Sequence, residues 1–182
     1  MNHRLSFRIR LSNSRRLATD KRGVAVVEFG LIVIPLIAII LAVVQMCVTL
    51  FIQQTLETAT EKAARLIMTG QNREANTSRA NFKTLVCSKL PSLVPCSDVM
   101  VDVAAYSTVS AVDTATPTIT YQNGTPNNSW SYDPGEDGEI VRLRVLYLAP
   151  SAYGPLNFTL ANQPNGKRLM LATMIFKNET TS

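Results

Sequence analysis

The chain is poor in the side chains that most enzymes use for catalysis. Its single histidine, His3, lies near the N-terminus. Catalytic triads that rely on an imidazole base, and metal sites built on histidine, need that side chain within the folded part of a protein. A glycine-rich phosphate loop and a Gly-x-Ser-x-Gly nucleophile turn are also missing. These absences argue against an enzyme, a hydrolase included, and the sequence predicts no catalytic residue, no metal site and no cofactor.

Charge is missing from residues 29–52, a run of 24 residues. At about 1.5 Å per residue a helix of this length covers about 36 Å, more than the hydrocarbon core of about 30 Å. The run therefore predicts a membrane-spanning helix. An ordinary secretory signal peptide is disfavoured, because the run is too long and no Ala-x-Ala-like cleavage site follows it. An uncleaved signal anchor remains the alternative.

The net charge of +5 is unevenly distributed along the chain. Residues 1–23 contain seven Lys and Arg and one acid, whereas the rest contains eleven basic and twelve acidic residues. The basic surplus thus belongs to the N-terminal leader, and binding of nucleic acid by the folded part is disfavoured. Basic residues beside a span stay on the cytoplasmic side, which predicts that the C-terminal part faces the opposite side.

Glu28 is the one ionisable residue within the apolar segment that follows Gly23. Acidic groups at the edge of a membrane span are costly and usually functional. A basic leader, a Gly, and an apolar helix with Glu at its fifth position resemble the class III signal peptide of type IV pilin-like proteins. The wider pattern is most similar to the TadE family of pseudopilins. The matching residues are Arg22, Gly23, Val24, Ala25, Val27, Glu28, Phe29, Pro35, Ala63, Ala64 and Arg65.

This resemblance implies that a prepilin peptidase cuts between Gly23 and Val24. Glu28 then pairs with the new amino group of Val24, in the same chain or a neighbour, and with Phe29 takes part in subunit assembly. The alternative for Glu28 is a solvated carboxylate at headgroup level. A pair of cysteines and an ending similar to Lys177-Asn178-Glu179 also occur in the family.

The implied function is that of a minor pseudopilin in the assembly of a Tad/Flp-type pilus, a fibre used in adhesion, biofilm formation or secretion. The implied location is the bacterial inner membrane, with a cytoplasmic N-terminus and a periplasmic domain. Implied partners are membrane lipid, the peptidase, other pilins and pseudopilins, and the inner-membrane assembly platform. The alternative function is a single-pass membrane anchor that presents a ligand-binding extracytoplasmic domain.

The helical pattern continues beyond the membrane, with small and apolar side chains at steps of three and four up to Ile67. One helix is expected from residue 24 to about residue 69, with Gly70 as its C-terminal cap. Pro35 removes a backbone donor inside the span and predicts a bend there.

Cys87 and Cys96 lie outside the predicted membrane with eight residues between them. On an oxidising side of the membrane such a pair closes a short loop, so we expect a disulfide. Two unpaired thiols are the alternative, and Cys47 is expected to be a small side chain within the span.

The remaining residues predict one small domain. A helix capped by Ser78 should run to about Leu90, followed by a strand over residues 99–106. Residues 107–128 predict an exposed loop or hairpin turning at Asn123 and Gly124. The acidic turn at residues 133–139 leaves calcium binding open.

Two further strands are expected over residues 139–149 and 167–177. In the first, Val141, Leu143, Val145 and Tyr147 alternate with Arg142 and Arg144. The second is apolar on both faces and should be central or covered by the long helix. The predicted fold class is α+β, with a leader at 1–23, a helix at 24–70 and a periplasmic domain at 71–182.

Overall fold

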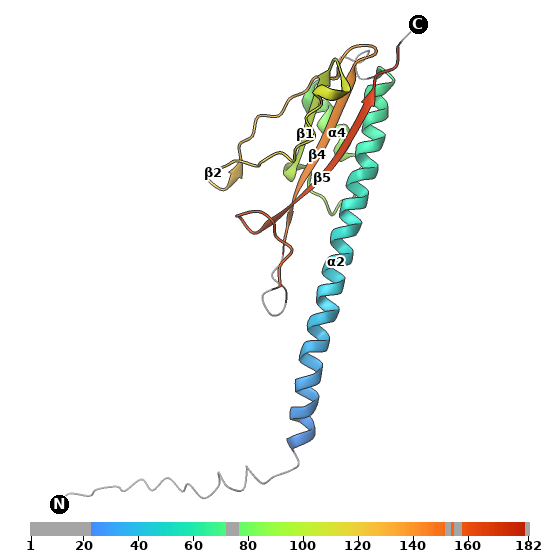
Figure 1. The fold of residues 1–182 in the computed structure, drawn as a ribbon. Helices are drawn as coiled ribbons and strands as arrows, with labels where there is room; N and C mark the ends of the chain where they lie inside the picture. The colour runs from blue at the N-terminus through green and yellow to red at the C-terminus, as the bar shows by residue number, and fades with distance from the viewer. Residues whose placement is uncertain (1–22, 72–76, 152–153, 155–157, 181–182) are drawn as a thin grey trace, which may run out of the picture. The chain divides into compact units, whose positions relative to one another are not determined.

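The computed structural model describes residues 23–71, 77–151, 154 and 158–180 (Figure 1). The chain divides into two compact units, Met1–Leu41 and Ala42–Ser182, and the long helix α2 (Val24–Met68) contributes residues to both. A long helix, a short helix and antiparallel sheets confirm the α+β fold class. Two short 3-10 helices, η3 (Cys96–Asp98) and η4 (Val109–Ala111), are also present.

Helix α2 begins and ends where the sequence predicts. It runs for 45 residues and contains Pro35 without interruption, while the bend expected there stays a prediction. Gly70, just after the helix, has a φ of 73°. Glycine adopts this left-handed backbone conformation readily because it has no Cβ. The Gly70 N–H donates to the carbonyl of Ile67 at 2.9 Å, which caps the last turn.

The short helix α4 (Arg79–Cys87) has the predicted N-cap. The Ser78 hydroxyl accepts a hydrogen bond from the N–H of Asn81 at 3.3 Å. The helix ends before the predicted Leu90, because the N–H groups of Lys89 and Leu90 donate to carbonyls three residues back and tighten the chain into turns. Cys87, its last residue, is joined to Cys96 in η3, so the expected disulfide is present.

Three strands form the main antiparallel sheet, in the order β1 (Val99–Tyr106), β4 (Ile140–Pro150) and β5 (Lys167–Lys177). The sequence leaves residues 167–177 either central or covered by the long helix, and the structure has the second arrangement, with β4 central and β5 at the edge of the sheet (Figure 1). Helix α2 lies beside this edge, and the Gln53 amide donates to the Leu171 carbonyl at 3.1 Å.

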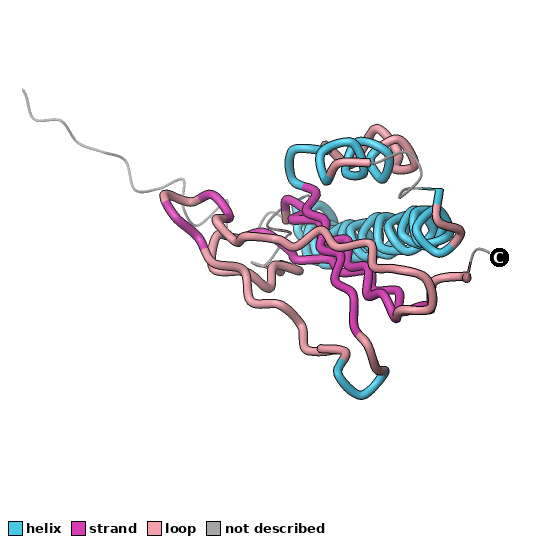
Figure 2. Tube along the Cα trace, turned by 90° about the horizontal axis from the view of Figure 1, so that it is seen from above, coloured by secondary structure: helices cyan, strands magenta, loops and turns pink. Residues whose placement is uncertain are grey.

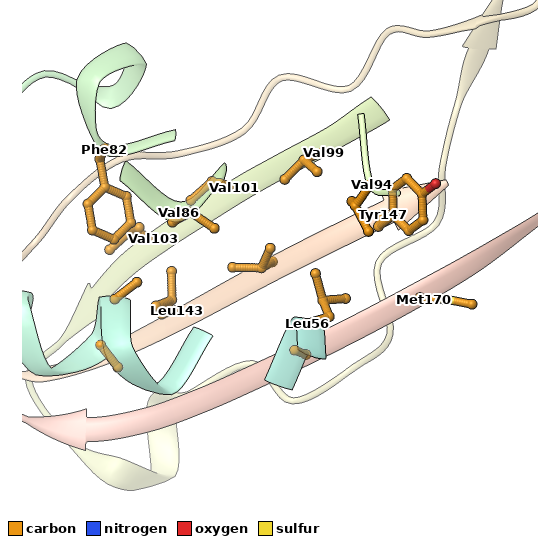
Figure 3. Close-up of a cluster of buried hydrophobic side chains, with 14 of the residues drawn as sticks. Leu56, Phe82, Val86, Val94, Val99, Val101, Val103, Leu143, Tyr147 and Met170 are labelled. Carbon is orange, nitrogen blue, oxygen red and sulfur yellow. The ribbon is translucent and has the colours of Figure 1, made fainter. Parts of the chain in front are cut away.

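One face of the sheet packs against α2 and α4, and these two helices lie on the same side of the strands in Figure 2. Strand residues at every second position point into this core, as the alternating pattern predicts. Figure 3 shows the core side chains of both helices and all three strands, among them Leu56, Phe82, Val86, Val101, Leu143 and Met170.

The opposite face of the sheet is covered by the loop between β1 and β4, which runs across the strands in Figure 2. This loop contains the predicted hairpin, formed by β2 (Tyr121–Gln122) and β3 (Thr125–Pro126). Asn123 and Gly124 turn it with φ values of 51° and 77°. Because the loop covers this face of the sheet, Arg142 and Arg144 are buried.

Candidate functional site

The site residues predicted at the N-terminal end of α2 are all exposed. Val24 is the first residue of the helix, and Gly23 precedes it. The side chain of Phe29 is 67% exposed, and Glu28 beside it is exposed as well. The described part of the chain therefore leaves this segment available to lipid or to another protein.

Val24 and Glu28 are four residues apart on one continuous helix. This spacing places both on the same face, about 6 Å apart along the axis. Within the described residues the Glu28 carboxylate has no hydrogen-bond or ion-pair partner. A cut before Val24 would create an ammonium group one turn from this carboxylate.

The surface around Glu28 is apolar over several turns of α2. In the described part of the chain, α2 is the one helix long and apolar enough to cross a membrane, with a mean hydropathy of 3.0 over 18 residues. Exposure of so many large apolar side chains to water would be unfavourable. Those on the first turns include Val26, Val27, Phe29, Leu31, Ile32 and Ile34.

Nothing in the described chain requires glycine at position 23. A Cβ added to Gly23 would meet no atom within 4 Å, and the same holds for Gly30. A requirement for glycine at position 23 would therefore come from another molecule, such as a peptidase that binds the backbone closely.

The sequence did not reveal a second group of functional-looking residues, which is a charged cluster on the loop-covered face of the sheet. Arg142 Nη2 lies 2.9 Å from Asp102 Oδ2, and its Nη1 donates to the backbone carbonyl of Asp113 at 2.7 Å. Arg144 Nη2 donates to the carbonyls of Asp113 and Ala115 at 2.6 and 2.7 Å. The two guanidinium groups thus fasten the β1–β4 loop to the sheet.

Asp113 is the acid at the centre of this attachment. Its carboxylate accepts from the N–H of Ala115 at 2.9 Å and lies near both arginines. The Ala115 N–H, and next the charges of Arg144 and Arg142, hold the pKa of Asp113 below its ordinary value of 3.8, against an opposing effect of burial. The charged side chains of this cluster bind one another and the loop backbone, which indicates a structural role.

Strand register offers the signal that could have identified this cluster. Asp102 lies directly opposite Arg144 across the β1–β4 pair, and Ala104 lies opposite Arg142. Opposite charges at facing positions indicate pairing on one face of a sheet. The pairing of the two strands has to be known before this signal is visible.

The described residues contain no group of three or more His, Cys, Asp or Glu side chains arranged to hold a metal ion. In the acidic turn that left calcium open, Asp133 accepts from the N–H of Gly135 at 3.0 Å. Glu139 accepts from the N–H of Glu136 at 2.8 Å. These carboxylates therefore stabilise the turn itself.

A family model matches the N-terminal part of the chain. Residues 23–65 match the model of the family described as TadE-like protein, which confirms the resemblance found in the motif around Gly23 and Glu28. The match includes most of α2 and leaves residues 66–182 outside it. No curated protein and no solved structure matches the chain. The family match and the apolar helix of the described residues together suggest a Tad pilus-associated protein with a membrane-anchor helix.

Proposed function

We propose that this chain is a non-catalytic minor pseudopilin that takes part in the assembly of a Tad/Flp-type pilus. The observation that carries the proposal is the family match over residues 23–65, which contains the predicted cleavage site and Glu28. In this proposal residues 1–23 are a cytoplasmic leader that a prepilin peptidase removes. Residues 24–70 anchor the protein in the inner membrane, and residues 71–182 fold in the periplasm.

Glu28 is the residue on which assembly depends in this proposal. A carboxylate without a partner costs at least about 2.5 kcal/mol near the middle of a membrane. Pairing with the Val24 ammonium group would lower that cost, since two neutralised charges enter lipid more readily than one alone. If the ammonium group comes from a neighbouring subunit, the pair also sets the depth at which two helices pack. Phe29 and the apolar side chains around it supply the contact surface.

The membrane-spanning part of α2 offers an assembly surface that the described part of its own chain does not cover. The side chains at residues 24–37 are largely exposed, and they have no partner element among the described residues. Other pilins and pseudopilins, and the inner-membrane platform, carry helices of the kind that could pack against this surface. Small residues such as Gly30 would permit close approach of a second helix.

The test replaces Glu28 by Gln in a cell that carries the assembly proteins. Glu28→Gln should leave processing and insertion largely intact and should abolish co-purification of pilin-like partners. Glu57→Gln is the matched control: residue 57 lies on the same helix, and the hydrogen bond that its side chain accepts from Gln53 at 2.8 Å can also be accepted by an amide oxygen. Undiminished association of the Glu28→Gln protein with its partners would reject the proposed role of Glu28.

The mature N-terminus separates this function from the membrane-anchor alternative. A pseudopilin should begin at Val24, whereas a simple anchor that presents a ligand-binding domain should retain residues 1–23. Sequencing the N-terminus of the purified protein decides between them. A chain with an intact leader that binds no pilin-like partner would exclude the proposed function.

A further inference from the structure

A small cavity lies between α2 and the ends of β4 and β5 that are joined by the long β4–β5 connection. Its volume is about 240 Å³. The walls are mainly apolar and include Val48 and Ile52 from α2, Leu160 from the connection, and Met170 from β5. At about 30 Å³ for each water molecule, the cavity could hold about eight waters, enough for a small polar group but not for a long chain.

Among the described residues that line this cavity, Arg168 is the one that carries a charge. Its Nη1 donates to the backbone carbonyl of Leu160 at 2.9 Å, and among the described residues it has no acidic partner. The neighbouring Lys167 differs, because it pairs with Asp98 at 3.2 Å. A guanidinium group has five N–H donors, so Arg168 keeps donors for an anionic ligand, and phosphate is an anion that arginine binds well.

The exposed apolar side chains of α2 indicate the depth in the membrane at which the cavity opens. Leu50 and Phe51 are 62% and 54% exposed, and the first charged residue after them is Glu57. Lipid must therefore extend to about Phe51 to keep these side chains out of water. Val48 and Ile52 in the cavity wall lie on the same turns of the helix. The cavity thus opens where hydrocarbon gives way to lipid headgroups.

A second apolar group lies on the same side of the domain. Phe158, in the β4–β5 connection, is partly exposed, and its carbonyl accepts from the N–H of Gly154. Gly154 lies close to Gln45 of α2, since a Cβ added to it would be 3.4 Å from the Gln45 Oε1 atom. Gly154 and Phe158 therefore lie near the apolar part of α2, and an exposed aromatic ring is well suited to a membrane interface.

We propose that this cavity binds the headgroup of an anionic membrane phospholipid. Arg168 holds the phosphate, the glycerol region occupies the cavity, and the acyl chains leave along Val48 and the exposed apolar face of α2. Charge complementarity and the apolar wall identify the ligand class. The proposal depends on insertion of α2 into a membrane and is independent of pilus assembly, so loss of partner binding in the Glu28→Gln protein would not affect it.

The experiment uses the full chain purified in mild detergent with phosphatidylglycerol or phosphatidylcholine. Native mass spectrometry counts the lipids retained by each protein. The wild-type chain should retain phosphatidylglycerol in preference to phosphatidylcholine. Arg168→Gln should weaken this retention about 10-fold or more, the loss expected for a charge-assisted hydrogen bond. Lys177→Gln is the matched control at the other end of β5, and it should bind like the wild type.

Two further measurements distinguish lipid binding in the cavity from binding of a simple anion to Arg168. Val48→Phe leaves Arg168 in place but fills the cavity, so it should reduce phosphatidylglycerol retention as well. Inorganic phosphate should not displace the bound lipid, because it lacks the part that contacts the apolar wall. Equal retention by the wild type, Arg168→Gln and Val48→Phe would overturn the proposal. Displacement by inorganic phosphate at concentrations equal to those of the lipid would also overturn it, in favour of a simple anion site.

Discussion

Arg142 and Asp102 form a buried ion pair between β4 and β1. The Nη2 and Oδ2 atoms are 2.9 Å apart, and the two side chains are only 7% and 9% exposed. The other carboxylate oxygen of Asp102 accepts from the N–H of Ser131 at 3.0 Å. This pair therefore ties together two strands and the loop that covers them, at a position where an unpaired charge would be strongly unfavourable.

Asp102→Ala should markedly destabilise the domain. The change leaves the Arg142 guanidinium buried with fewer partners, and loss of one member of a buried pair typically costs about 3 to 5 kcal/mol. Asp98→Ala is the control, because its pair with Lys167 is about one-third exposed and should contribute no more than about 1 kcal/mol. Urea unfolding of the full chain in detergent, followed by Trp130 fluorescence and circular dichroism, measures both. Equal free energies of unfolding for the two variants would contradict this view.

Acid should weaken the attachment of the loop through Asp113. The pKa of this group is lowered in the folded state, chiefly by the Ala115 N–H and then by Arg144 and Arg142. Such a group stabilises the fold above its unfolded-state pKa, and that stabilisation is lost as the pH falls through the folded-state value. The stability difference between wild type and Asp113→Asn should be constant from neutral pH to about pH 5 and should shrink below the ordinary value of 3.8.

The pH series compares Tm values of the two proteins in the same detergent. Asp133→Asn serves as a second variant: this turn acid accepts from the N–H of Gly135, and no ion pair joins it to either arginine among the described residues. A wild-type advantage over Asp113→Asn that persists unchanged to the lowest pH would show that the carboxylate charge is not what holds the loop.

Loss of the disulfide should loosen α4 and leave α2 and the sheet intact. Cys87 and Cys96 are nine positions apart, and closing a loop of this size contributes about 2.5 kcal/mol by the chain-entropy estimate. The double change Cys87→Ser and Cys96→Ser should increase hydrogen exchange of the amides of α4 more than that of β4. Cys47→Ser, in the exposed apolar part of α2, is the control and should change neither.

Gly23→Val should leave the leader attached to the protein. The chain itself has room for the larger side chain, since nothing lies within 4 Å of a Cβ at this position. A failure to cleave would therefore report on access of the peptidase and not on misfolding. Both proteins are purified from cells that carry a prepilin peptidase, and their intact masses are measured. The wild-type mass should correspond to a chain that begins at Val24, and the mass of the variant to the full-length chain. Gly30→Ala has similar free space and should be cut normally.

Much of the fold could be predicted because it depends on local patterns. The capping Ser78 and the turn at Asn123 and Gly124 each follow from the conformation that one or two residues prefer. The core face of β4 follows from the alternation of its apolar residues. Cys87 and Cys96 are near in sequence, so their pairing needed little knowledge of the rest of the chain.

The order of the strands could not be predicted in the same way. The apolar character of residues 167–177 indicates cover on both faces, and a central strand and an edge strand beside a helix both provide it. The structure has the second arrangement. The hydrogen bond from Gln53 to the Leu171 carbonyl joins residues 118 positions apart, and no local pattern contains that information.

The sequence by itself determined the long apolar helix, the spacing of Gly23 and Glu28, and the family resemblance, because each depends on contiguous residues whose spacing on one helix is fixed by 3.6 residues per turn. Only the tertiary structure decided the environment of Arg142 and Arg144. Charges that alternate with apolar residues indicate a solvent-exposed face, but here a loop returns from β1 and brings Asp113, about 30 positions away, over both arginines. Burial depends on what covers a surface, and that cover comes from a distant part of the chain.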